Sequence, residues 1–179
     1  LGYGKYKVCE EKTQLLQGDG WTQTQPAKDG CYKVEVNRHN RKHQDLNFGN
    51  APHSMEVTAV PVCIDNFPYF RWSVTPKHFT PTKFTLTWST TSDEVVTTEE
   101  FAPDNVNISY DSENNTYTGV TLWPGASPTL PDWPGWSLVD GKWVEDPNDF
   151  GGNLRPSAKV TISVNPTEQV AVDYPSTSS

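Results

Sequence analysis

Hydrophobic and polar residues alternate along several short stretches of the chain, as they do in β-strands that bury one face. In residues 83–88, the alternation places Phe84, Leu86 and Trp88 on one side of an extended chain and lysine and threonines on the other. Residues 159–164 repeat the alternation with valine and isoleucine. Stretches of this kind predict strands over residues 3–9, 31–36, 55–63, 70–74, 83–88, 106–110, 116–122, 157–164 and 169–174.

Turn-forming residues predict two β-hairpins. Asp140 and Gly141 separate residues 136–139 from residues 142–144, and an Asp-Gly pair favours the two-residue type I′ turn of a hairpin. The Asn-Pro-Thr segment of residues 165–167 joins the last two predicted strands in a similar way. Both hairpins fall in the second half of the chain.

The composition favours the same class of fold. The 179 residues include 37 valines and threonines but only 16 alanines and leucines, and β-branched side chains suit sheets better than helices. The 15 prolines and 12 glycines leave little room for long helices, and only residues 10–17 suit a short one. We therefore expect an all-β fold, a compact antiparallel sandwich or barrel with long loops and little or no helix. Residues 1–174 are expected to form a single domain and residues 175–179 a linker-like tail.

Aromatic content and charge exclude several classes of protein. Hydrophobic residues make up only 34% of the chain. Its 21 aromatic residues nevertheless indicate a folded protein, because disordered segments contain few aromatic residues. No apolar run approaches the roughly 20 residues that a membrane-spanning helix needs, so we expect no membrane insertion. The net charge of −8 argues against nucleic-acid binding, which needs a basic face. Residues 1–91 carry net +3 and residues 92–179 net −11, which predicts a negative surface that either keeps the protein soluble or steers a cationic partner.

The cysteines and the chain ends indicate the context of the domain. Cys9, Cys31 and Cys63 include no CxxC pair, so at most one disulfide can form, and three buried free thiols are the interpretation we favour. Because the chain begins at Leu1 without a signal segment, we expect it to be a fragment of a longer protein.

The most distinctive stretch is residues 122–136, which hold three tryptophans, four prolines and two glycines. Proline restricts the loop, so aromatic rings can be presented to a partner at a low cost in entropy. Tryptophan rings stack on sugars or anchor protein interfaces, and the alternative for each ring is packing in the core. The candidate binding residues here and on the following hairpin are Trp123, Asp132, Trp133, Trp136 and Trp143.

The only basic cluster, residues 38–43, is a second candidate site. Arg38, Arg41 and Lys42 can hold sulfated sugars, phosphate or acidic lipid through point charges and guanidinium forks. The alternative is an exposed loop that binds nothing. Two histidines in the cluster have a spacing that suits a metal ion only on a helix, and the flanking residues favour a loop.

No signature of catalysis or of a cofactor is present in the sequence. It contains neither a Gly-x-Ser-x-Gly elbow nor the GxxxxGK[ST] or GxGxxG phosphate loops. Asp140, Glu145, Asp146 and Asp149 offer oxygens to calcium, but their spacing does not match an EF-hand loop. We therefore expect a protein that is not an enzyme and that has no cofactor and no metal site.

An acidic, turn-rich, all-β domain of this size with unpaired cysteines resembles the capsid spike domains of astroviruses and hepatitis E-like viruses. The resemblance implies a homodimeric spike on the virion surface that attaches to a host receptor, protein or glycan, and is bound by neutralising antibodies. Unpaired cysteines favour assembly in the cytosol. Two alternatives remain: an extracellular carbohydrate-binding module of a secreted protein that uses the tryptophan-rich loop, and an interaction domain of a bacterial or phage surface protein.

Overall fold

The structure is a computed structural model that describes residues 2–11, 20–129 and 132–175. Strands dominate it, and a short 3₁₀ turn, η1 (Gly152–Leu154), follows the twelfth of them. The strands are β1 (Gly4–Cys9), β2 (Trp21–Gln25), β3 (Cys31–Val36), β4 (Gly49–Pro52), β5 (Ser54–Ile64), β6 (Phe67–Lys77), β7 (Phe84–Ser89), β8 (Val95–Phe101), β9 (Ile108–Asp111), β10 (Thr116–Leu122), β11 (Trp136–Val139), β12 (Lys142–Glu145), β13 (Ser157–Ser163) and β14 (Thr167–Asp173).

The predicted all-β fold is confirmed. The described residues contain no α-helix, and their antiparallel sheets do not close into a barrel. Of the two architectures that the sequence left open, the structure is consistent with a sandwich. The short helix predicted over residues 10–17 falls mainly on residues 12–19, which lie outside the described residues.

The contacts of the chain divide it into two compact units. Unit 1 comprises Leu1–Ser54 and Lys77–Phe79, and unit 2 comprises Met55–Pro76 and Thr80–Ser179. Unit 1 carries 9 basic and 6 acidic residues, and unit 2 carries 5 basic and 16 acidic residues, a net charge of −11. That residues 1–174 form a single domain, with residues 175–179 as a linker-like tail, stays a prediction.

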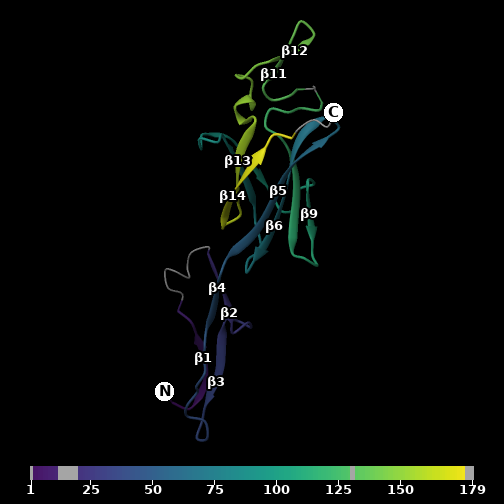
Figure 1. The fold of residues 1–179 in the computed structure, drawn as a ribbon. Coiled ribbons are helices and arrows are strands. Elements are labelled where there is room, and N and C mark those ends of the chain that lie inside the picture. Colours follow the sequence, from purple (N-terminus) through teal and green to yellow (C-terminus); the bar gives the residue numbers. More distant parts are fainter. Residues whose placement is uncertain (1, 12–19, 130–131, 176–179) are drawn as a thin grey trace. The chain divides into compact units, whose positions relative to one another are not determined.

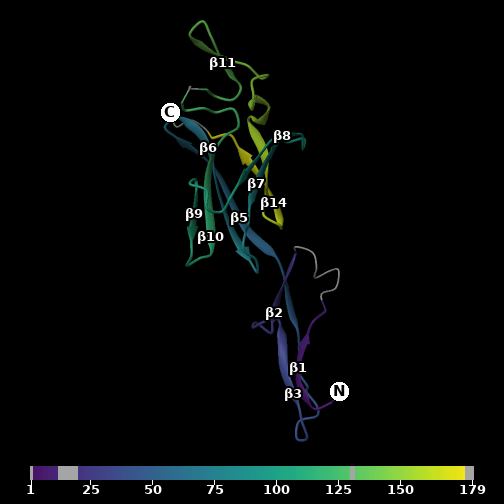
Figure 2. The ribbon, with the colours of Figure 1, turned by 180° about the vertical axis from the view of Figure 1, so that it is seen from behind.

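Unit 2 is built on two four-stranded antiparallel sheets, ordered β5-β6-β10-β9 and β14-β13-β7-β8 (Figures 1 and 2). Aromatic rings of β6 and β7 pack between them: Phe70 against Trp88 and Trp72 against Phe84, each pair with 5.2 Å between ring centroids. Phe84, Leu86 and Trp88 are fully buried, as the alternation along residues 83–88 predicted. Large rings thus supply the bulk of a core that contains few aliphatic residues.

Both predicted hairpins are present in unit 2. β11 pairs with β12 and β13 with β14, both antiparallel. Asp140 and Gly141 both have the positive φ angles, 49° and 76°, that a type I′ turn requires. Figures 1 and 2 show the hairpin of β11 and β12 beyond the ends of the sandwich strands.

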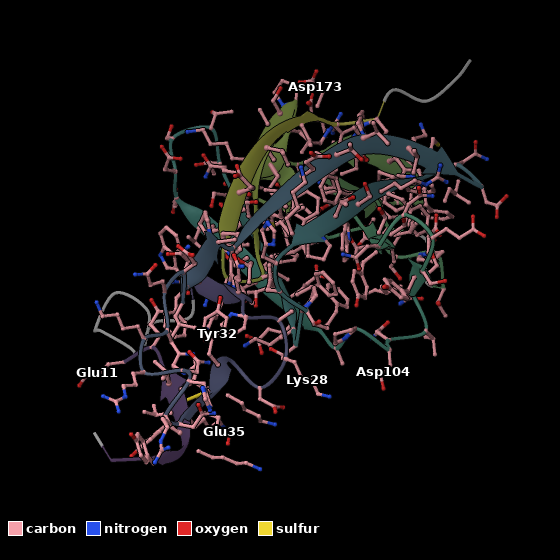
Figure 3. The ribbon with its side chains drawn as sticks, turned by 90° about the horizontal axis from the view of Figure 1, so that it is seen from below. Glu11, Lys28, Tyr32, Glu35, Asp104 and Asp173 are labelled. Carbon is pink, nitrogen blue, oxygen red and sulfur yellow. A yellow bond between two sulfur atoms is a disulfide. The ribbon has the colours of Figure 1, made fainter. Side chains whose placement is uncertain are left out.

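Unit 1 consists of two two-stranded ribbons, β1-β3 and β2-β4, and is cross-linked by a disulfide. The antiparallel register of β1 and β3 places Cys9 directly opposite Cys31, and the two form the disulfide drawn in yellow in Figure 3. The favoured interpretation of three buried free thiols is therefore wrong, and Cys63, the free cysteine, is exposed. The argument from unpaired cysteines to the cytosol loses its basis, because disulfides persist mainly in oxidising compartments.

A tryptophan surface and a half-buried carboxylate

The predicted site residues belong to both units and form two separate groups. Arg38, Arg41 and Lys42 belong to unit 1, whereas the four tryptophans and Asp132 belong to unit 2.

Trp123 is a core residue that presents no exposed ring to a partner, so its predicted role in binding gains no support. Its side chain is fully buried, and its ring packs 5.0 Å from that of Trp88 and 5.1 Å from that of Tyr174. The physical reason lies in β10, where every second side chain points inward; Trp123 continues that series directly after the strand. The ring fills the end of the sandwich and is not exposed at the surface.

The loop that follows Trp123 is fixed by close backbone contacts. Gly125 and Gly151 have φ angles of +90° and +80°, and a Cβ atom on either would overlap a backbone carbonyl, that of Phe150 or of Pro124 respectively. Only glycine fits at both positions, which locks residues 124–125 against residues 150–151. This contact holds Phe150, 57% of which is exposed, at the edge of the loop.

Asp132 shapes the loop. Its backbone exchanges two hydrogen bonds with Ser127, of 3.0 and 3.1 Å. Its carboxylate accepts a hydrogen bond of 3.0 Å from the backbone N–H of Trp133. The observed contacts of Asp132 are thus structural, and a role in binding stays a prediction.

Trp136 is half-buried and packs on a cation. The guanidinium of Arg155 lies 5.8 Å from the ring centroid of Trp136 and 4.7 Å from that of Tyr174. Such an arrangement is held by cation–π attraction and by the apolar stem of the arginine. Trp136 therefore anchors the base of the hairpin, and a role in binding stays a prediction.

Trp133 and Trp143 form an aromatic cluster with Phe67 of β6. The ring of Trp133 stacks on Phe67, with 5.2 Å between centroids and 5° between planes, and its Nε1 donates a 3.1 Å hydrogen bond to the carbonyl of Asn66. The ring of Trp143 stands at 89° to that of Trp133, with 4.8 Å between centroids. Two of the tryptophans that were selected from the sequence, Trp133 and Trp143, are therefore in contact in the structure.

The hairpin exposes apolar side chains around this cluster. Leu138 is the cross-strand partner of Trp143 and lies on the same face; 59% of Leu138 and 38% of Trp143 are exposed. Val139 and Val144, also exposed, lie on the opposite face. Phe67, Trp133, Leu138 and Trp143 are called the tryptophan surface below.

A pocket of about 500 Å³ lies between β8 of one sheet and β10 of the other. β9 pairs with β10 only from Thr116 to Gly119, and the pocket is lined by the part of β10 beyond that stretch, residues 120–122. Its lining combines rings, a carboxylate and an amide: Tyr69, Thr97, Glu99, Phe101, Asn107 and Phe150, together with residues 120–126.

Glu99 is the one acidic residue that lines this pocket. Burial raises the pKa of its carboxyl group above the ordinary value, because desolvation disfavours the charged form. None of the other described residues forms an ion pair or a hydrogen bond with this carboxylate. The next residue, Glu100, lies on the other side of β8 and pairs with Lys83.

The basic segment of unit 1 forms a loop, as expected. Arg41 donates a 2.9 Å hydrogen bond to the hydroxyl of Tyr3, and its guanidinium lies 5.8 Å from that ring's centroid. Arg38 and Lys42 are exposed to solvent. Binding of an anion by these three residues stays a prediction.

The acidic residues near the hairpin hold the loop together. Asp146 accepts a 2.9 Å hydrogen bond from the hydroxyl of Ser137, and Asp149 accepts one of 3.0 Å from the backbone N–H of Gly135. Within residues 2–11, 20–129 and 132–175, no group of three or more His, Cys, Asp or Glu side chains is arranged to hold a metal ion. These hydrogen bonds give the two carboxylates a structural role.

Sequence reasoning missed the pocket. Its acidic residue, Glu99, occupies every second position together with Thr97 and Phe101, a pattern that places a carboxylate on the same face of a strand as an aromatic ring. That pattern indicates a carboxylate on the inner face only once residues 95–101 are known to form a strand. β8 was not predicted from the sequence.

No protein-family model matches this chain, and comparison with curated proteins and with solved structures found no match. None of the helical segments described here has the length and hydrophobicity needed to cross a membrane.

Proposed function

We propose that the chain is a non-enzymatic surface recognition domain, and that it serves as a viral capsid spike which attaches the particle to a host receptor and carries antibody epitopes. The observation that supports this most is the tryptophan surface, where Trp143 stays 38% exposed although its ring is held perpendicular to that of Trp133. An exposed ring that is already oriented binds a partner without a further cost of ordering.

The chemistry of the hairpin supports a binding surface over a purely structural role. An isolated two-stranded hairpin is marginal in water, so the contacts of Trp133 with Trp143 and Phe67 are needed to hold it. Stability alone does not require Leu138 to be exposed. Contiguous exposed apolar side chains on a folded protein mark interaction sites, and tryptophan is prominent among the residues that dominate binding energy.

The host receptor is the occupant that we propose for the tryptophan surface. Receptor attachment requires a surface that stays accessible on the assembled particle. The hairpin lies beyond the ends of the strands of its own sandwich, where the sheets do not cover it (Figure 1). We further propose that the chain is a homodimer and that it functions on the virion surface.

One observation favours a second candidate function, a carbohydrate-binding module of a secreted protein. The disulfide between Cys9 and Cys31 suits an oxidising, extracellular compartment. Trp143 suits stacking on the C–H face of a sugar ring. Both candidates use the same tryptophan surface and differ in oligomeric state.

The test combines binding with oligomeric state. The labelled chain is applied to an array of sialylated, fucosylated and sulfated glycans and to a panel of cultured animal cells, and its mass is measured by light scattering. A spike is expected to show saturable binding and twice the mass of the chain. A monomer that binds neutral glycans supports the carbohydrate module. Absence of saturable binding to both the array and the cells contradicts the proposed function.

A further inference from the structure

We propose that the pocket between β8 and β10 receives a lysine or arginine side chain of a protein partner, with Glu99 as its counter-ion. This site is distinct from the tryptophan surface and shares no residue with it. The inference is therefore independent of the function proposed above.

Glu99 occupies a position that a sandwich normally fills with an apolar side chain. In the register of β7 and β8, Glu99 lies directly opposite Leu86, which is fully buried. Opposed residues of an antiparallel pair point to the same face, so the carboxylate points to the inner side of the sheet. Placing a carboxylate there costs free energy, because the group loses part of its hydration.

Among the described residues, no ion pair or hydrogen bond to the Glu99 carboxylate compensates that cost, and desolvation is the one cause that raises its pKa. Lys83 pairs with Glu100 and Lys159 with Asp93, so two of the five basic side chains of unit 2 are engaged elsewhere. A third, Arg155, packs against Trp136 and Tyr174. A half-buried carboxylate that faces a pocket without an internal partner is a common feature of a binding site.

The rings around Glu99 suit a cation as well. Phe101 flanks Glu99 on the same side of β8, and Tyr69, Trp123 and Phe150 complete the aromatic lining. Aromatic faces attract ammonium and guanidinium groups, and more strongly when the cation is partly desolvated. Gly125 fixes the backbone of Phe150 through the close contact described above, so the backbone on this side of the pocket is held in place.

The charge of unit 2 favours a cation over a neutral sugar. Rings and a carboxylate are also found in sugar sites, where the carboxylate accepts hydrogen bonds from hydroxyl groups. The net charge of −11 does not attract a neutral ligand. It raises the local concentration and the association rate of a cationic ligand. A positive group would also lower the cost of ionising Glu99.

The test uses three peptides and a sugar as probes of the full chain. The probes are acetyl-Gly-Lys-Gly-amide, acetyl-Gly-Arg-Gly-amide, acetyl-Gly-Gln-Gly-amide and galactose. Each is titrated into the protein at low salt while its backbone amide shifts are followed by NMR. The lysine and arginine peptides are expected to shift the amides of residues 97–101 and 120–125, and the glutamine peptide to bind at least about tenfold more weakly. Raising the salt to about 0.5 M is expected to weaken the binding of both cationic peptides.

Two variants at neighbouring positions give a matched comparison. Glu99→Gln keeps the shape of the side chain and is expected to lower the affinity for the cationic peptides at least about tenfold. Glu100→Gln removes the same charge from the other side of β8 and is expected to leave the affinity nearly unchanged. Phe150→Ala is expected to cost about two- to fivefold, the size of one cation–π contact.

Several outcomes overturn the proposal. Equal binding of the glutamine peptide, an unchanged affinity in Glu99→Gln, or equal losses in Glu99→Gln and Glu100→Gln would each show that Glu99 is not a counter-ion. Binding of galactose that depends on Glu99, without binding of the cationic peptides, would identify a sugar site instead. None of these results bears on Trp143, so they leave the proposed receptor surface unaffected.

Discussion

The indole of Trp133 lies flat on the phenyl ring of Phe67, with 5.2 Å between centroids and 5° between planes. This stack joins the tryptophan-rich loop to the start of β6, and Trp143 in turn rests against Trp133. The orientation of the exposed ring on the hairpin therefore depends on a residue nearly 80 positions earlier in the chain.

Phe67→Ala is expected to loosen the hairpin of β11 and β12 while the sandwich stays folded. The variant loses one aromatic pair, about 0.5–1.5 kcal/mol beyond its buried area. Hydrogen exchange is expected to accelerate about tenfold at the amides of residues 136–145 and to stay unchanged in β7 and β13. Unchanged protection of the hairpin would contradict the anchoring role of Phe67.

Gly119→Ala is expected to destabilise the sandwich by roughly 1–3 kcal/mol, the range for overpacking a core. The indole of Trp72 covers Gly119 so closely that an added Cβ would overlap the ring, and Trp72 is almost fully buried. Urea unfolding measures the change. Gly20→Ala is the control, because a Cβ there meets no atom within 4 Å; equal effects of the two substitutions would contradict the packing argument.

Replacing Cys9 and Cys31 together by serine is expected to destabilise unit 1 by about 3 kcal/mol, the usual effect of opening a loop of this length. Calorimetry of this variant also tests whether residues 1–174 form a single domain. A shift confined to one of two transitions would show that the units unfold separately; a shift of one shared transition would support a single domain. Cys63→Ser, at an exposed free thiol, is expected to change nothing.

Glu99→Gln is expected to stabilise the protein at neutral pH. Because burial raises the pKa of Glu99 in the folded state, stability is lost as the pH rises from the ordinary carboxyl value of about 4.5 through the raised value. The gain at pH 7 is expected to be a few tenths of a kcal/mol, since solvent screens a half-exposed group, and to vanish near pH 3, where the carboxyl is protonated in both states. A loss of stability at pH 7 would show that the carboxylate has a favourable partner.

The sequence predicted most of the strands and missed β2, β4 and β8. Residues 31–36 and 116–122 were predicted with the bounds that the structure shows, since Val, Tyr and Thr alternate there with a clear polarity. β2 is mostly exposed on both faces, and β4 is four residues long and contains glycine and proline. Neither has the periodicity on which prediction relies; their pairing comes from contacts between distant segments.

The candidate site was predicted in part for the same reason. Composition drew attention to all the tryptophans of residues 122–136, but it cannot separate a ring that continues a strand's inner face, Trp123, from one that stacks on a distant strand, Trp133. Predicting the pocket would have required knowing which edges of the two sheets lie next to each other. The position of Glu99 is unusual only because it is paired with the buried Leu86. The register that pairs two strands cannot be derived from the residues of one strand alone.

The central claim, that Trp143 contacts the receptor, is tested by comparing Trp143→Ala with Trp21→Ala. Trp21 is a tryptophan of unit 1 with a similar exposed fraction, 45% against 38% for Trp143, so the two variants lose similar side chains. The measurement is the apparent affinity of each folded variant for the glycan or cell line that binds the unmodified chain best. We expect Trp143→Ala to lose at least about 2 kcal/mol of binding free energy, roughly thirtyfold in affinity, and Trp21→Ala to change little. An unchanged affinity in Trp143→Ala would contradict the proposed role of Trp143.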